Sequence, residues 1–595
     1  MGSEPAPAAA RAAAWSLDRL PLAALLAVVV PTLIAFDGPV FPRAWNHLTA
    51  LIGWGFFCAV LAAATHGAPP APSRAGGRLV WLMTALGLIA LGCAVSMGWR
   101  GLPPGFGVGT FGFLAAAGLC AAVGARLQQA GLGAAAFRPF CQALVLAAVC
   151  GILIGCIQFF APGWVDGWFI GISNAAARMG GNLRQPNQLC SLIAMAAAAL
   201  VWLHDRAERD GGSRLPWRRV VAVVLAVFLG AGAAGTLSRS GAVCIAIVCL
   251  WTLLDRTPSR AARLLPWVLA AAAVIVQPHV YDWSPTGPQG VRALLEHRAA
   301  DPSGHRFGLW SNCLDLIRQS PLGGVGWGQL NFAWSLTSFD KRFPQNPDNA
   351  HNLAVHLAVE LGLPMAIVVC GLLLVALGSA LRAARQAITP DRGVARASLV
   401  MVLVLAFHSL VEYPLWMALF LLPAGFALGL ATGARGPVET AASPRAPSAG
   451  LLALGGLLLA AGGVWAAVDL GRAQEVGRMT AGAPAAAAHV FFYRPHAEWL
   501  ADQPVRRPLA ERPFHLVMKL PPVQDMQIIE WSRALAERGD TDRARYLAQL
   551  VRRRASSEAD RFFAPCKDEA VPEASRPYQC SPPERAWSYA DFQNR

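Results

Sequence analysis

The sequence has 595 residues, of which 55% are hydrophobic and only 14% are charged, whereas a typical soluble domain has about 25% charged residues. With a mean hydropathy of +0.43 and 20 tryptophans, this composition excludes a string of soluble domains and predicts an integral membrane protein. The net charge of +15 comes from scattered arginines without a dense basic block, so no nucleic-acid partner is expected.

Thirteen apolar segments have about the 20 residues that a helix needs to cross a bilayer. We expect membrane-spanning helices at residues 20–36, 47–64, 79–97, 108–126, 139–160, 188–203, 219–236, 239–254, 264–279, 362–381, 396–413, 415–432 and 449–468. The first segment could be a signal peptide, but it has no A-x-A cleavage site before Asp37, which favours an uncleaved helix. The predicted fold is an all-α polytopic membrane protein.

Arginine is about four times as frequent in one set of short loops as in the other. By the positive-inside rule, the N-terminus is then cytoplasmic and the C-terminal region lies outside. We expect a cytoplasmic tail (1–19), transmembrane helices 1–9 (20–279), a large outer loop (280–361), transmembrane helices 10–13 (362–468) and an outer helical C-terminal region (469–595).

The C-terminal region has the apolar spacing of two helices around Gly539, which predicts a helix–turn–helix between residues 528 and 547. The same region contains Cys566 and Cys580 in a polar segment. Outside the cell membrane, in an oxidising compartment, these two cysteines could form a disulfide.

Arg239 lies in the sequence Leu-Ser-Arg-Ser-Gly, between two spans that would otherwise merge. An ionisable residue at such a place is costly and often marks function, and its planar guanidinium suits phosphate oxygens. On position alone, an arginine that snorkels to the interface beside a tight turn is an equally good explanation.

Arg306 stands at the start of an amphipathic helix in which Phe307, Trp310, Leu314 and Ile317 have helical spacing. The backbone N–H groups of a helix N-terminus favour anions. Taken alone, this motif is better explained as an ordinary interfacial helix with a solvated arginine.

His351 ends the large outer loop and is expected to begin the next helix. Its unperturbed pKa of about 6.5 suits a general base near neutral pH, although without other context a structural capping role explains it better. His356 is five residues further on, so the two imidazoles are not expected to bind one metal ion from a single helix face.

Two further polar segments adjoin predicted spans. Residues 180–188 read Gly-Gly-Asn-Leu-Arg-Gln-Pro-Asn-Gln, and residues 408–416 contain Glu412 and Tyr413. Near a membrane these side chains need hydrogen-bond partners, which indicates a polar pocket; helix capping and a proline turn are the alternative. All five segments fall on the outer side under an orientation derived from arginine counts alone.

Together, these motifs resemble a known superfamily. SRSG between two spans, R-x-x-x-W followed by SPLGGVGWG, and HN-x₇-E-x-G after a large outer loop resemble the O-antigen ligases and polymerases. GN-x-x-QPN and HSLVEYPLW resemble, within that superfamily, the bacterial protein O-oligosaccharyltransferases of the pilin-glycosylation ligase type. The resemblance covers about residues 20–470.

The resemblance implies transfer of a preassembled glycan from undecaprenyl pyrophosphate to a Ser or Thr hydroxyl of an exported protein, such as pilin, at the periplasmic face of the bacterial inner membrane. His351 would be the essential histidine, and Arg239 and Arg306 would bind the pyrophosphate. The residues expected to bind substrates in the same motifs are Arg184, Gln185, Asn187, Asn352, Glu412 and Tyr413.

No pair of outer carboxylates flanks a plausible site, and the outer segments contain no Asp-rich or His/Cys cluster with the spacing of metal ligands. We therefore expect direct displacement with inversion and neither a metal ion nor a cofactor. The expected partners are the lipid-linked donor, the exported acceptor and membrane lipids. An O-antigen ligase acting on the lipid A core, or a glycan polymerase, is the alternative. A transporter or flippase is disfavoured because the polar motifs gather at one face and no internal repeat occurs.

Overall fold

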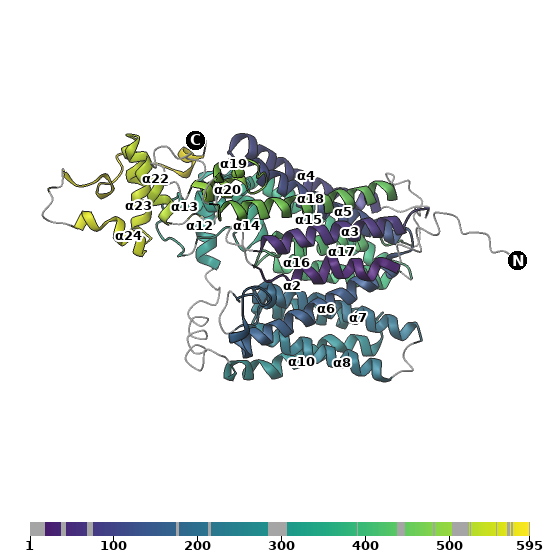
Figure 1. Ribbon diagram of the computed structural model, residues 1–595. Helices are drawn as coiled ribbons and strands as arrows, with labels where there is room; N and C mark the ends of the chain where they lie inside the picture. Colours follow the sequence, from purple (N-terminus) through teal and green to yellow (C-terminus); the bar gives the residue numbers. More distant parts are fainter. Residues whose placement is uncertain are drawn as a thin grey trace. The chain divides into compact units, whose positions relative to one another are not determined.

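The computed structural model describes most of the chain (Figure 1). The residues described are 18–36, 43–67, 75–173, 178–211, 216–283, 306–344, 346–389, 391–436, 447–479, 482–502, 523, 525–554, 556–567, 572 and 575–593. Most of the predicted N-terminal tail lies outside these ranges. So do residues 284–305 of the predicted large loop and residues 503–522 of the predicted C-terminal region.

Helices make up the fold, and the described residues contain no β-strand. This confirms the predicted all-α polytopic membrane protein. Among the described residues, nine helices are long and apolar enough to cross a membrane. They are α3 (Ala44–Ala64), α4 (Ala75–Trp99), α5 (Pro104–Gln129), α6 (Gly133–Phe160), α7 (Pro186–Arg209), α8 (Pro216–Thr236), α10 (Arg260–Asp282), α15 (Leu363–Gln386) and α18 (Ala449–Val476).

The four other predicted spans also fall on helices. The first span contains two short consecutive helices, the π-helix η1 (Leu25–Val29) and α2 (Val30–Leu33). The other three correspond to α9 (Arg239–Leu254), α16 (Asp391–His408) and α17 (Ala418–Thr432). Two of them, α9 and α17, are apolar but shorter than 18 residues. Helical structure therefore occurs in all thirteen segments, although two helices end short of the predicted bounds, α2 at Leu33 and α16 at His408. The number of membrane crossings stays a prediction.

Contacts between Cα atoms divide the chain into two compact units, which we describe separately. The first unit comprises Met1–Leu86, Gly112–Pro302 and Gly371–Ala467, and the second comprises Gly87–Phe111, Ser303–Cys370 and Val468–Arg595.

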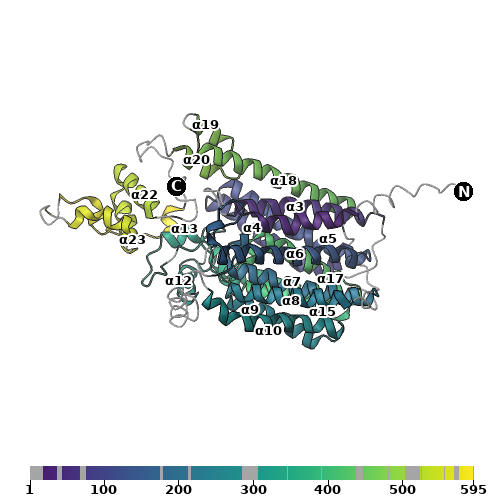
Figure 2. The ribbon, with the colours of Figure 1, turned by 60° about the horizontal axis from the view of Figure 1, so that its bottom comes forward.

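The first unit is a bundle with α7 at its centre. Helices α6, α8, α9, α10 and α16 all pack against α7. In the stretch of α7 that is apolar enough to cross a membrane, 89% of the residues are buried. Figures 1 and 2 both show α6, α7, α8 and α10 running side by side. An aromatic cluster adds to the core: the Trp54 ring lies 5.5 Å from Phe57, 5.9 Å from Phe140 and 5.6 Å from Phe426.

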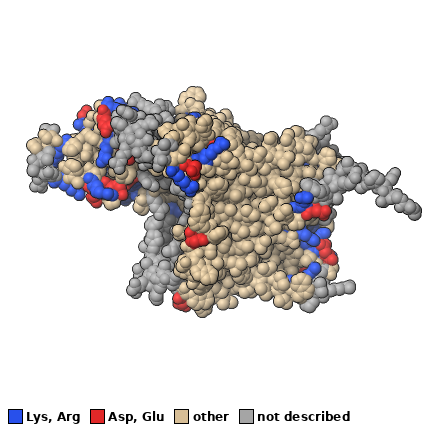
Figure 3. All heavy atoms as spheres, viewed as in Figure 1, with Lys and Arg blue, Asp and Glu red and all other residues tan. Residues whose placement is uncertain are grey.

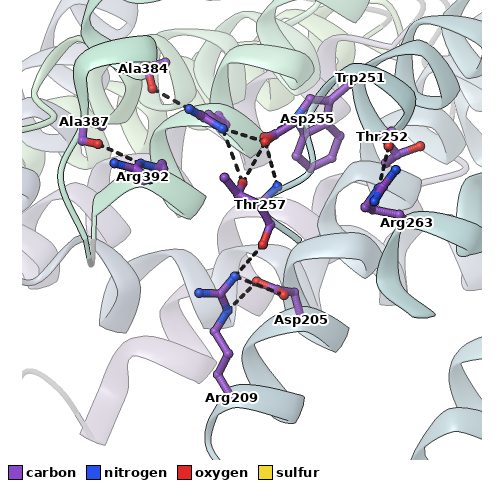
Figure 4. A network of polar contacts seen from close by, with 11 residues as sticks. Asp205, Arg209, Trp251, Thr252, Asp255, Thr257, Arg263, Ala384, Ala387 and Arg392 are labelled. Carbon is purple, nitrogen blue, oxygen red and sulfur yellow. Dashed lines mark hydrogen bonds and ion pairs between the residues drawn. The ribbon is translucent and has the colours of Figure 1, made fainter. Parts of the chain in front are cut away.

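Charged side chains are nearly absent from a broad area of the face seen in Figure 3. Helices of this bundle carry exposed apolar residues such as Leu146, Leu153 and Val224. A polar network joins the ends of α7, α9 and α16 (Figure 4). Arg209 donates to Asp205 at 3.0 Å and to the Thr257 carbonyl at 2.7 Å, and Arg396 donates to Asp255 at 2.6 Å. The arginine counts predict that this end is cytoplasmic.

The second unit contains shorter helices. They are α12 (Arg306–Gln319), α13 (Leu330–Ser335), α14 (Leu353–Leu361), α19 (Ala483–Ala488), α20 (Arg494–Asp502), α22 (Asp525–Glu537), α23 (Thr541–Arg552) and α24 (Ser557–Phe562). Helices α22 and α23 confirm the predicted helix–turn–helix, with Gly539 at the turn in a left-handed conformation (φ 83°). The structure joins Cys566 to Cys580 in the disulfide that the sequence allowed.

Glycines bring α17 and α5 together in the first unit. Gly425, Gly429 and Gly433 recur every fourth residue, and a Cβ added at any of them would lie under 3.0 Å from backbone atoms of α5. Small residues at this spacing let helices in membranes approach closely.

We therefore predict that Gly429→Val lowers the thermal unfolding midpoint of the detergent-purified protein, because overpacking of this kind costs about 1–3 kcal/mol. The control is Gly378→Val, since a Cβ at Gly378 meets no atom within 4 Å. Equal midpoints for the two variants would contradict the close packing of α17 and α5.

Candidate active site

Asn187 is the centre of a polar cluster in the first unit. Its Nδ2 donates to Oε1 of Glu412 at 2.8 Å. Its Oδ1 accepts hydrogen bonds from Oγ of Ser238 at 2.8 Å and from Nη2 of Arg178 at 3.0 Å. Three motifs that are far apart in the sequence, GN-x-x-QPN, SRSG and HSLVEYPLW, therefore meet at one amide group.

Sequence reasoning missed Arg178 as part of this cluster. Its Nε also donates to the Thr236 carbonyl at 2.8 Å, so Arg178 joins the end of α8 to the start of α7. Its only signal in the sequence is that it is one of the few arginines in the predicted outer loops. No motif draws attention to it.

His408 and Ser191 form a second contact beside the Asn187–Glu412 pair. Nδ1 of the buried His408 lies 2.7 Å from Oγ of Ser191. On α7, Ser191 is one helical turn after Asn187. In the turn that follows α16, the Glu412 N–H donates to the His408 carbonyl at 2.8 Å. The matched spacing of N-x-x-x-S and H-x-x-x-E in the two motifs could have indicated these two side-chain contacts.

Glu412 and Tyr413 lie beyond the end of α16, which stops at His408. The predicted span continued to residue 413, but a residue that precedes a proline is disfavoured in a helix, and Pro414 starts a 3₁₀ turn. Tyr413 caps that turn and is half-buried.

Arg184 and Gln185 hold the segment that leads into α7. The Gln185 side chain accepts a hydrogen bond from the Gln188 N–H at 3.0 Å and so caps the helix. Arg184 is buried in a left-handed conformation (φ 59°) and donates to Oδ1 of Asn46 at 2.9 Å. These contacts position the segment, and a role in substrate binding stays a prediction for both residues.

Arg239 is the first residue of α9 and is exposed. The predicted break between the two spans is present, because α8 ends at Thr236 and Ser238 caps α9 by accepting from the Gly241 N–H at 3.0 Å. Ser238 is also bound to Asn187. The start of α9, where backbone N–H groups favour anions, is thus fixed to the polar cluster.

His351 lies just before α14 in the second unit. It is partly exposed, and its backbone is left-handed (φ 49°). Asn349 accepts a hydrogen bond from its N–H at 3.1 Å. The helix that His351 was expected to begin starts instead at Leu353, because Asn352 caps it by accepting from the Val355 N–H at 3.1 Å.

Trp310 connects α12 to the His351 segment. Its indole N–H donates to the carbonyl of Ala350, the residue before His351, at 2.9 Å. Arg306 is one turn before Trp310 on the same helix face, and it is partly exposed. The R-x-x-x-W motif therefore sets the start of α12 beside the residue predicted to be the base.

His356 is buried, and its ring contacts two other residues of the second unit. Its Nδ1 accepts from the Ala350 N–H at 3.3 Å, and its Nε2 lies 3.2 Å from Oε2 of Glu360. Because both ring nitrogens face partners inside the protein, His351 is the better placed of the two imidazoles to meet a substrate.

The Glu360 carboxylate ties the SPLGGVGWG motif to α14. It accepts hydrogen bonds from the Gly328 N–H at 2.9 Å and the Leu330 N–H at 3.2 Å. Gly324 and Gly362 are both left-handed, and a Cβ at either would lie under 3.0 Å from backbone atoms of the other segment. Hence these motif glycines permit close contact between two backbone segments.

The C-terminal region braces the outer loop within the second unit. Tyr546 donates to the Leu336 carbonyl at 2.6 Å, and Arg554 donates to the Ser335 carbonyl at 2.8 Å. Gln593 donates to the Val325 carbonyl at 2.6 Å. Burial and the nearby Arg554 lower the pKa of Arg342 in this loop to about 9.

The predicted catalytic residues are divided between the units: Arg239 belongs to the first, whereas Arg306 and His351 belong to the second. Their convergence on one diphosphate therefore stays a prediction. Within the described ranges, no group of three or more His, Cys, Asp or Glu side chains is arranged to hold a metal ion.

Three protein-family models match the chain. They describe an O-antigen ligase, at residues 222–370, the C-terminal part of a virulence factor membrane-bound polymerase, at 396–550, and a protein glycosylation ligase, at 180–204. The first match contains Arg239, Arg306 and His351, and the third contains Asn187.

A curated relative, the general O-oligosaccharyltransferase of Acinetobacter baylyi, is 26% identical over 306 residues. The aligned part covers 49% of this chain and 50% of the relative, so the chain matches about half the length of that protein. These matches confirm the resemblance inferred from the motifs.

We predict that Glu360→Ala destabilises the protein markedly, because it leaves two backbone N–H groups without their acceptor, at about 1–3 kcal/mol each. The thermal unfolding midpoint in detergent measures the effect. Asp315→Ala is the matched control, since Asp315 is an exposed carboxylate paired with Arg318 on α12. If the unfolding midpoint of Glu360→Ala were no lower than that of the control, the stabilising role of the Glu360 hydrogen bonds to Gly328 and Leu330 would be contradicted.

Proposed function

We propose that this chain, which belongs to the superfamily of O-antigen ligases and protein glycosylation ligases, is an O-linked oligosaccharyltransferase. It moves a preassembled glycan from undecaprenyl pyrophosphate to Ser or Thr hydroxyls of exported proteins. The observation that carries the proposal is the Trp310–Ala350 hydrogen bond, which sets the helix of Arg306 beside His351 inside the region matched as an O-antigen ligase.

The donor's pyrophosphate requires positive charge around its oxygens. Arg239 and Arg306 each occupy the first position of a helix, α9 and α12, where backbone N–H groups add to the attraction for anions. As the glycosidic bond breaks, charge builds up on the leaving pyrophosphate, and guanidinium groups stabilise it through paired hydrogen bonds.

The acceptor hydroxyl requires a base. In the proposed reaction, His351 takes the proton of the hydroxyl while its oxygen bonds to the anomeric carbon. The bond from that carbon to the phosphate oxygen breaks, and undecaprenyl pyrophosphate leaves with the electron pair. This is a single displacement with inversion, and it uses neither a metal ion nor a cofactor.

The other predicted site residues divide into two roles in this proposal. Asn352 and Tyr413 stand beside His351 and Glu412 and are half-buried. In this proposal they contact the substrates, although Asn352 also caps α14. The residues whose contacts hold the site in shape are Arg184, Gln185, Asn187 and Glu412.

The proposed location is the bacterial inner membrane, with the site facing the periplasm. The arginine bias supports this orientation. The Cys566–Cys580 disulfide in the C-terminal region supports it independently, since disulfides persist in oxidising compartments such as the periplasm.

A second candidate shares the donor and differs in the acceptor. The matches to O-antigen ligases and to membrane-bound polymerases favour transfer to a lipid A core sugar or to a growing glycan. Mass spectrometry of exported proteins, with and without the gene, distinguishes the two. Glycan-bearing Ser or Thr peptides that vanish on deletion support the protein acceptor, and an unchanged glycopeptide set contradicts it.

We predict that His351→Ala lowers glycan transfer to an acceptor peptide by about 10²–10⁴-fold, the usual contribution of a general base, while the lipid-linked donor is still made. His489→Ala is the control, because His489 is an exposed histidine of the same unit. Full transfer by the His351→Ala enzyme would exclude this imidazole as the base.

We predict that Arg239→Lys raises the KM for the lipid-linked donor by about tenfold, because lysine keeps the charge but loses the guanidinium fork. Arg260→Lys is a close match as a control: Arg260 is also an exposed first residue of a helix behind a capping serine, but at the predicted cytoplasmic end. A donor KM that is the same in both variants would argue against pyrophosphate binding by Arg239.

A further inference from the structure

Exposed apolar side chains are concentrated in residues 160–172 of the first unit, directly after α6. Five large side chains have most of their surface exposed: Phe160 (57%), Trp164 (72%), Trp168 (65%), Phe169 (82%) and Ile172 (68%). Soluble surfaces rarely present so many large apolar groups together, and such patches mark contact with a partner or a membrane.

This patch continues the lipid-facing side of a membrane span. Leu146 and Leu153 on α6 are 42% and 51% exposed, and together with Phe160 they recur every seventh residue, on one face of the helix. Because α6 is long and apolar enough to cross a membrane, this face meets lipid. Trp164 and Trp168, also mostly exposed, follow in the chain just after the end of the helix.

A second helix apolar enough to cross a membrane, α10, is followed by an aromatic residue that lies next to Phe160. Trp283, just after α10, is 52% exposed, and its ring lies 6.2 Å from that of Phe160. Aromatic residues, tryptophan above all, are enriched where membrane spans leave the hydrocarbon for the headgroup region.

The backbone of the patch is folded into a tight turn that satisfies its own polar groups. Asp166 is the only charged residue between 161 and 172, and its Oδ1 accepts hydrogen bonds from the N–H groups of Trp168, Phe169 and Ile170 at 2.8–3.0 Å. A turn whose N–H groups are bonded internally can enter the edge of the bilayer at lower cost than an open loop.

Asn182 fastens this turn to the segment that carries the Asn187 cluster. Its side chain donates to the Phe169 carbonyl at 2.9 Å and accepts from the Gly171 N–H at 2.8 Å. Gln158 adds bonds to the carbonyls of Gly171 at 2.6 Å and Gly181 at 2.9 Å. The depth of the turn in a membrane therefore sets the depth of the segment leading into α7.

We propose that residues 160–172 form an aromatic anchor that inserts at the headgroup boundary and binds the acyl chains of bilayer phospholipids. The occupant is the bulk phospholipid, because the patch is continuous with the lipid-facing side of α6. The anchor positions the entrance of α7 relative to the membrane surface, and it does not depend on the reaction proposed above.

The test places the photocrosslinking residue p-benzoylphenylalanine at Phe169 of the full-length protein, reconstituted in phosphatidylethanolamine–phosphatidylglycerol vesicles without donor or acceptor. Intact-mass spectrometry after irradiation detects bound lipid. We expect a phospholipid adduct at position 169 as efficient as that of a second variant with the probe at Leu153, on the lipid-facing side of α6.

Loss of the adduct at position 169, with the Leu153 variant still crosslinked, would overturn the anchor. So would an adduct that appears only when an undecaprenyl-linked donor is added, since the patch would then bind the donor's isoprenoid chain. Either result overturns the anchor without removing glycan transfer, which is measured with the His351 and Arg239 variants, so the two proposals fail separately.

Discussion

Polar groups inside an apolar helical bundle need partners within the protein, because no water is there to supply them. Each unit meets this constraint around one side chain. In the first unit, the Asn187 side chain forms hydrogen bonds with Glu412, Ser238 and Arg178. In the second, the Glu360 carboxylate serves two backbone N–H groups and faces His356. Arg239 and His351, the residues proposed to meet the substrates, are each next in the chain to a residue of these networks, Ser238 and Ala350.

Within each of the motifs, some residues hold the backbone in place and another is exposed. In SRSG, the first serine binds Asn187 and caps α9, whereas the arginine is exposed. In HN-x₇-E-x-G, the glutamate and glycine lock the backbone, whereas the histidine is partly exposed. Each motif therefore combines a partly or fully exposed polar side chain with groups that hold the backbone in place, so substitutions at the two types of position act for different physical reasons.

The sequence was sufficient for the features that depend on local chemistry. Apolar length located helices on all thirteen predicted segments, the Leu-Ser-Arg-Ser-Gly segment located the break between α8 and α9, and Gly539 located the turn between α22 and α23. Contacts between distant segments were not predictable. Nothing local shows that Arg178 reaches Asn187, that Glu360 accepts from the glycine loop, or that Gln593 reaches Val325, because each pairing depends on the tertiary path of the chain.

The contact between Gln593 and the Val325 carbonyl has a consequence for biosynthesis. The two residues are 268 positions apart, and the loop that contains Val325 also pairs with α14. During translation this loop emerges long before the residue that completes its hydrogen bonding. Residue 593 must therefore be synthesised, and the C-terminal helices folded, before this loop has all of these hydrogen bonds.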